Sequence, residues 1–343
     1  MERHSKGFYL AGISTGLLSF AMTAVAEDTP VYIAAQENNW QIGGSALYMQ
    51  PNEGFTYATV QKETYDNVMF EQHLDTLNQT YTVNRDFDWG YDAFIRYNFE
   101  GADRDLLLNY MHFSSSDSSN VDLGELNSSY IYNQFTYTAE GSVDTNINMA
   151  DLLAGQYVHF GEELKVHFVA GVTYARVKQK ENVAYDKGLE ATSADVLENY
   201  PLAQEAYESF DSTFNGVGPK FGIDGNYNIN RSSFGLVGGI SYALLYGTQE
   251  YSSQLQTSNG PGGPAHPVAP PFNVTTNDFD NNSVVVSNIN ANLGLRFVCD
   301  LANDGEESLD LELGYQVYQY LDVVYDEEDV SIAGPYLTAA VSF

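Results

Sequence analysis

Residues 87–100 read FDWGYDAFIRYNFE, and this stretch decides the fold class. Its odd positions are aromatic or aliphatic throughout, whereas its even positions include Asp88, Asp92, Arg96 and Glu100. Side chains alternate between the two faces of a β-strand, so a period of two predicts a strand with one apolar and one charged face. A soluble sandwich would bury the apolar face, whereas a membrane barrel would expose it to lipid.

The same alternation recurs along the chain. It is clear in residues 164–174, 217–227, 234–247, 285–297 and 309–317, and weaker in 40–50, 103–113, 145–160 and 331–343. With residues 87–100 these segments make ten expected strands, several of them longer than the ~9–11 residues that cross a bilayer at a tilt. In the strand over residues 234–247 we expect Ile240 to contact lipid and Ser241 to face the lumen.

The connections between these segments alternate strictly in length. Short connections fall at 100–103, 161–163, 230–232 and 302–305, whereas long ones cover 51–86, 114–144, 178–212 and 250–283. Transmembrane barrels have short periplasmic turns and long extracellular loops, and a soluble sandwich has no reason to sort its loops in this way. The sequence therefore predicts an all-β, antiparallel, up-and-down transmembrane barrel of about ten strands, or twelve if 51–86 or 114–144 hides two more.

The net charge limits which partners the protein can bind, and the amino terminus indicates the cellular compartment. The chain carries 14 Lys+Arg against 46 Asp+Glu, a net charge of −32, which excludes nucleic acid as a partner because phosphate binding needs clustered basic side chains. Residues 1–26 hold Arg3 and Lys6, then an uncharged run ending in AVA, and so predict a secretory signal peptide. Residues 27–343 are then the barrel. The mean hydropathy of the whole chain, −0.28, fits this fold, because half of each strand and all loops are wet.

Several phrases resemble one known family. They are WQIGGSALYMQP (40–51), DFDWGYDAFIRYNF (86–99), LAGQYVHFGEELKVHFVAGVTYARV (153–177), FNGVGPKFGIDGNY (214–227) and the GPYL of the final strand. They resemble the Legionella major outer membrane protein family and span nearly all of the expected mature chain. The resemblance implies a porin-like protein of the Gram-negative outer membrane. Members of the family are linked with disulfide-bonded complexes, but this chain has only Cys299, which could bond only to another chain.

The last strand alternates through Leu337, Ala339 and Val341 to a terminal Phe343. This ending resembles the signal that outer-membrane barrels present for assembly. The expected partners are accordingly outer-membrane lipid and lipopolysaccharide and the barrel-assembly machinery. A homo-oligomer is a further alternative that the sequence leaves undecided.

The polar faces of the strands supply the expected lumen wall. Its residues are Asp88, Asp92, Arg96, Glu100, Lys165, Lys220, Asp224, Asn288, Asn290, Asn292, Arg296, Asp310 and Glu312. Two interpretations follow from the same wall. It is either a salt-bridged filling of a narrow barrel or an ion-selecting surface, and ten strands fall nearer the eight of filled barrels than the sixteen of aqueous channels.

Two functions are therefore expected. The first is a porin-like channel for passive diffusion of small hydrophilic solutes or ions, weakly cation-preferring because acids outnumber bases in the wall. The second is a structural or adhesive barrel with a filled lumen and partner-binding surface loops.

No cofactor, metal site or enzyme activity is expected. His159 and His167 flank a turn, and barrel-wall polar residues are the favoured interpretation of both over metal ligands. An omptin-like surface protease would need a His–Asp pair at the outer rim. The outer-side candidates His73, His112 and His266 have no recognisable catalytic context.

Overall fold

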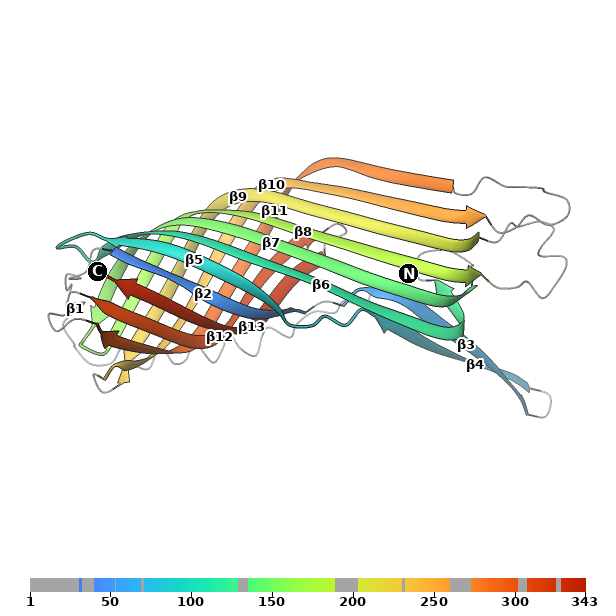
Figure 1. Ribbon diagram of the computed structural model, residues 1–343, viewed down its shortest axis with the longest axis horizontal. Helices are drawn as coiled ribbons and strands as arrows, with labels where there is room; N and C mark the ends of the chain where they lie inside the picture. Colours follow the sequence, from blue (N-terminus) through green and yellow to red (C-terminus); the bar gives the residue numbers. More distant parts are fainter. Residues whose placement is uncertain are drawn as a thin grey trace.

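The computed structural model describes residues 31–32, 40–52, 54–68, 71–128, 135–188, 203–229, 232–259, 273–301, 307–324 and 328–343. The expected signal peptide, residues 1–26, lies outside these ranges. Within them, no helix is long and apolar enough to cross a membrane. The molecule is built from strands, and Figure 1 shows them as one elongated, curved sheet.

Ten antiparallel strands close into a barrel, as predicted. In order around the barrel they are β2 (Trp40–Pro51), β5 (Asp88–Asn98), β6 (Arg104–Ser128), β7 (Phe135–Phe160), β8 (Leu164–Gly188), β9 (Ala203–Asn228), β10 (Phe234–Asn259), β11 (Asn273–Asp300), β12 (Ser308–Val324) and β13 (Glu328–Ser342). Each pairs with the next, and β13 pairs with β2 to complete the ring. Trp40 and Phe343 extend this last seam by exchanging two backbone hydrogen bonds of 3.0 and 2.9 Å.

The long connection after β2 contains two further strands that do not enter the barrel wall. β3 (Thr56–Val68) and β4 (Glu71–Thr82) form a hairpin, which joins the sheet where Ala58 and Thr59 pair with β6. A two-residue strand, β1 (Val31–Tyr32), pairs with β7 at the opposite end. The barrel therefore has ten strands rather than the alternative twelve.

The other long connections lie at the expected end, but much of each is strand rather than loop. The six strands β6 to β11 run for 25 to 28 residues and continue their pairing well past the barrel. Figure 1 shows them reaching beyond β12 and β13, with the hairpin β3–β4 beside them. We call this part the strand extension.

The outer face of the barrel is apolar, as the alternation predicts. Trp89 is 69% exposed and Ile240 is 54% exposed, whereas Ser241 is half-buried on the lumen side. The register predicted for residues 234–247 is confirmed. An exposed band of large apolar side chains is stable only against lipid, and a closed barrel satisfies all its backbone hydrogen bonds there.

Candidate functional site

The lumen contains a polar cavity of about 510 Å³, which we call the chamber. Its lining includes Gln41, Asn98, Ser308 and Ser342, which lie at the short-turn ends of β2, β5, β12 and β13. The chamber therefore occupies the half of the barrel nearest the short turns. A smaller cavity of about 140 Å³ adjoins it and is lined by residues that include Asp151 and Lys220.

Most of the residues expected in the lumen wall surround these cavities. The chamber is lined by Asp92, Arg96, Lys165, Asp224, Asn292, Arg296, Asp310 and Glu312, and the smaller cavity by Lys220 and Asn290 among others. Asn288 is buried farther along β11, and Asp88 is half-buried at the long-connection end of β5.

Glu100 is a correction to the expected wall. It is exposed in the turn that follows β5 rather than lying on a strand. The chain turns at this point, where the amide of Ala102 donates to the carbonyl of Phe99, so the alternation of β5 no longer governs the direction of the side chain.

Both arginines of the chamber are paired with carboxylates. Arg296 Nε lies 2.8 Å from both carboxylate oxygens of Asp310, its neighbour across β11 and β12. Arg96 Nε lies 3.0 Å from Asp105 Oδ2, and Arg96 Nη1 donates to Gln41 at 3.0 Å. Such pairs offset the cost of holding charges away from bulk water.

His167 connects two carboxylates in the same wall. Its Nε2 lies 3.0 Å from Asp105 Oδ1 and its Nδ1 lies 3.5 Å from Asp224 Oδ2, while the ring of Tyr157 stacks on the imidazole at 4.0 Å. Within the described ranges, no three His, Cys, Asp or Glu side chains gather closely enough to hold a metal ion. The sequence interpretation missed Asp105 and Tyr157, although both follow the inward alternation of β6 and β7.

A buried ion pair lies deeper in the lumen. Lys220 Nζ is 2.8 Å from Asp151 Oδ2, and both side chains are almost fully buried. Lys220 was expected in the wall, whereas its partner Asp151 was missed. Lys220 Nζ also lies 4.0 Å from Met149 Sδ, so this pair borders on apolar packing.

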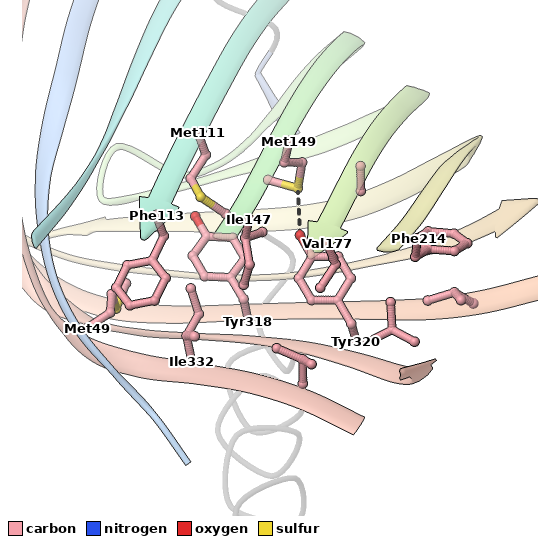
Figure 2. Packing of buried hydrophobic residues seen from close by; sticks show 14 of the residues in the cluster. Met49, Met111, Phe113, Ile147, Met149, Val177, Phe214, Tyr318, Tyr320 and Ile332 are labelled. Carbon is pink, nitrogen blue, oxygen red and sulfur yellow. Dashed lines mark hydrogen bonds between the residues drawn. The ribbon is translucent and has the colours of Figure 1, made fainter. Parts of the chain in front are cut away.

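On the side of this ion pair that faces away from the short turns, apolar side chains from nine of the ten barrel strands fill the lumen. We call them the apolar layer: Leu47, Met49, Met111, Phe113, Ile147, Met149, Val177, Phe214, Leu245, Val286, Tyr318, Tyr320 and Ile332. All except Tyr318 are at most 2% exposed. Figure 2 shows Met111 and Met149 on one side facing Tyr318 and Tyr320 on the other, with the Tyr320 hydroxyl 3.7 Å from Met149 Sδ. The smaller cavity ends against Met149 and Tyr318.

A buried polar network lies beyond the apolar layer. Arg85, just before β5, is buried and binds Asp117 at 2.8 Å, Ser115 at 2.7 Å and Thr145 at 2.8 Å. This network fixes the segment that follows the hairpin against the inner faces of β6 and β7. The sequence offered no signal for it, because Arg85 lies in a connection without alternation.

The hairpin segment is also packed against the strand extension through apolar contacts. The cluster comprises Phe55, Tyr57, Ala58, Val83, Ala139, Val143, Val183, Tyr185 and Ala206. The Tyr185 hydroxyl donates to the carbonyl of Tyr57 at 2.8 Å. Gly141 gives the ring of Tyr57 its space, because a Cβ there would lie 2.6–2.7 Å from the ring and its Cβ.

The strand extension contains one partly buried carboxylate, that of Glu208. Glu208 lies on β9, beyond the exposed apolar band that begins near Val217. One of its carboxylate oxygens is buried without a hydrogen-bond partner. Burial raises the pKa of Glu208 to about 7, because the charged form loses hydration there.

Comparison with known proteins places the chain in a family. The sequence pattern described as "Legionella pneumophila major outer membrane protein precursor" matches residues 32–343. The chain belongs to this family. Membership and the closed barrel together establish an outer-membrane β-barrel protein, so the chamber lies toward the periplasm and the strand extension outside the cell. No curated protein matches the sequence.

Solved structures share only the general architecture with this family member. The outer membrane protease OmpT of Escherichia coli is 10% identical with a TM-score of 0.37, over 91% of this chain and 97% of that one. A Pseudomonas aeruginosa FadL homologue is 9% identical with a TM-score of 0.29, over 92% and 90%. The Ralstonia pickettii toluene transporter TbuX is 9% identical with a TM-score of 0.27, over 89% of each chain. These likenesses are too distant to bear on function.

Proposed function

We propose that this member of the Legionella major outer membrane protein family is a structural barrel with a filled lumen, which presents its strand extension to partners outside the cell. The apolar layer carries the proposal. Side chains that are at most 2% exposed, such as Met149 and Tyr320, meet across the barrel axis. A hydrated ion crossing this level would lose its water without a polar partner, and apolar constrictions close channels for that reason.

The strand extension supports the second half of the proposal. β11 pairs with β10 from Asn273 onward but with β12 only from Ser287 onward. Among the described residues, the outer half of β11 therefore has one free edge. Free strand edges are common docking sites for an additional strand from another protein.

Planar-bilayer conductance of the purified, refolded protein tests the filled lumen. We expect no stepwise openings at 1 M KCl. The variant Phe113→Ala, Met149→Ala, Tyr320→Ala should conduct, because it removes large side chains from three strands of the apolar layer. A matched variant on the lipid face, Leu152→Ala, should stay silent. Regular openings by the unmodified protein would contradict the proposal.

A second candidate function is a passive channel for small hydrophilic solutes or ions, in which the apolar layer moves aside. The chamber favours it, because a large charged cavity is not needed by a purely structural barrel. Its lining holds four carboxylates, Asp92, Asp224, Asp310 and Glu312, against the three permanent cations Arg96, Lys165 and Arg296. Such a channel should prefer cations weakly, and reversal potentials across a KCl gradient should show this at low salt. An anion preference would exclude it.

We further propose that the protein is not an enzyme and that it meets lipid, lipopolysaccharide and the assembly machinery. His112 lies on the outward face of β6 against Asn148 and Tyr91 and has no carboxylate partner among the described residues. The side chain of His73 and all of His266 lie outside the described residues. Phe343 is 52% exposed at the barrel seam, which suits a role as the assembly signal.

A further inference from the structure

The ion pairs of the two chamber arginines leave charges of both signs on the chamber wall. Arg96 is paired with Asp105, and Arg296 with Asp310. Among the described residues, no carboxylate lies within ion-pair distance of Lys165, whose ammonium contacts the ring of Tyr157 at 5.4 Å from the centroid. Lys165 is thus the cation that remains available.

The available acid is Asp224. Among the described residues, its partner within ion-pair distance is His167, at 3.5 Å, and 53% of its side chain is exposed to the chamber. Two of the other three carboxylates are better satisfied, since Asp310 is bound by Arg296 through two oxygens and Glu312 accepts a hydrogen bond from the Tyr336 hydroxyl. Asp92 has one oxygen buried without a hydrogen-bond partner, but it lies on β5, three strands away from Lys165 on β8.

Lys165 and Asp224 lie side by side on the chamber wall. Lys165 pairs with Asn226, and His167 with Asp224, in the antiparallel register of β8 and β9. Lys165 and Asp224 are therefore diagonal neighbours on the same face, with Cα atoms about 7–8 Å apart. Among the described residues, neither side chain has a permanent opposite charge within ion-pair distance, so the two can receive the two ends of a small ligand of mixed charge.

The total charge of the chamber selects the class of ligand. A simple anion would enter a cavity whose carboxylates outnumber its permanent cations by four to three. A simple cation would leave Lys165 without a partner. A zwitterion adds no net charge and forms a charge-assisted contact at both ends, and such contacts are stronger than neutral hydrogen bonds.

From this arrangement we infer that the chamber is a periplasm-facing binding site for small zwitterions of the amino-acid or dipeptide class. Lys165 binds the ligand carboxylate and Asp224 binds the ligand ammonium. The chamber volume of about 510 Å³ is within the range of sites for small molecules. This inference does not depend on whether the barrel conducts, because the site lies on the periplasmic side of the apolar layer.

Calorimetric titration of the full chain in non-ionic detergent tests the inference, with glycylglycine as the probe. N-acetylglycylglycine keeps only the negative end and glycylglycinamide only the positive end. We expect each of these to bind at least about tenfold more weakly than glycylglycine, since each lacks one of the two charge-assisted contacts. Equal affinity for the three probes, or no measurable binding of glycylglycine, would overturn the site.

Substitutions at Lys165 and Asp224 test whether glycylglycine binds between these two side chains. Lys165→Met and Asp224→Asn should each weaken glycylglycine binding at least about tenfold, whereas Lys165→Arg should retain it because the charge is kept. Lys180→Met, on the strand extension, is the matched control and should bind as the unmodified protein does. The Lys165→Arg variant also separates loss of the site from loss of the fold. Binding unchanged by Lys165→Met would refute the assignment.

Discussion

Lys220 Nζ lies 2.8 Å from Asp151 Oδ2, and both side chains are buried where the chamber gives way to the apolar layer. Removing one partner of such a pair leaves the other charge buried and uncompensated. We expect Asp151→Asn to lower the free energy of unfolding by about 3–5 kcal/mol, measured by urea unfolding from lipid vesicles.

The exposed pair of Lys178 and Asp211 provides the control for this prediction. Its separation is 2.9 Å, close to that of the buried pair, but its side chains are 41% and 31% exposed. Asp211→Asn should cost no more than about 1 kcal/mol. Equal costs for the two variants would show that Lys220 and Asp151 are hydrated rather than buried.

The register of β10 makes a second prediction. Ile240 is 54% exposed to lipid, and Ser241 lines the smaller cavity. Ile240→Arg should lower the free energy of unfolding by about 2–4 kcal/mol if it lies near the bilayer midplane. Ser241→Arg should cost far less, because its side chain can reach the polar chamber. The same unfolding titration measures both variants, and similar losses would argue against this register.

Alternation in the sequence was sufficient to predict the ten barrel strands and most of the wall. Asp92 and Arg96 lie in the chamber because a period of two fixes the face of every residue on a strand. Asp105 and Asp151 follow the same rule and could have been added. Glu100 was misplaced because it lies two residues past the end of β5 at Asn98, in a turn where side chains no longer alternate.

The apolar layer and the strand extension could not be predicted in the same way. Met149 and Tyr320 lie far apart in the sequence and meet only because the barrel brings their strands face to face. Inward apolar residues on a single strand do not reveal whether the opposite wall supplies partners. The strand extension was missed for a different reason. Its strands carry Ser, Thr and Asn in runs such as residues 114–120, which are also typical of loops.

The raised pKa of Glu208 predicts how the strand extension responds to pH. Its folded pKa of about 7 lies above 4.5, the ordinary pKa of a glutamate. The folded state therefore holds the proton more tightly than the unfolded state between these two values. Local stability is greatest below the unfolded pKa and declines as pH rises through about 7, then stays level. Amide hydrogen exchange in β8 to β10 should accelerate over this window.

Glu208→Gln should remove most of this pH dependence, because the neutral side chain has no proton to lose. Glu140→Gln is the matched control, since Glu140 is exposed on β7 in the same extension. It should leave the pH profile as it is. An unchanged profile in Glu208→Gln would mean that another group is responsible.

The last prediction concerns Arg85 and the buried polar network that it forms beyond the apolar layer. Its guanidinium binds Asp117, Ser115 and Thr145 at once, and both Arg85 and Asp117 are buried. Arg85→Ala leaves the Asp117 carboxylate without its cation, so the segment after the hairpin should detach from β6 and β7. Arg85→Lys should rescue only in part, because an ammonium cannot reproduce the planar fork. Limited proteolysis of the protein in vesicles, read by mass spectrometry, should show new cleavage between residues 52 and 87.

Gly141→Val should give the same cleavage by a separate route, since its side chain takes the space of Tyr57. The apolar layer lies deeper and is untouched by either change, so both variants should remain silent in bilayer conductance. Resistance to protease in both variants would show that the hairpin is not held by these contacts.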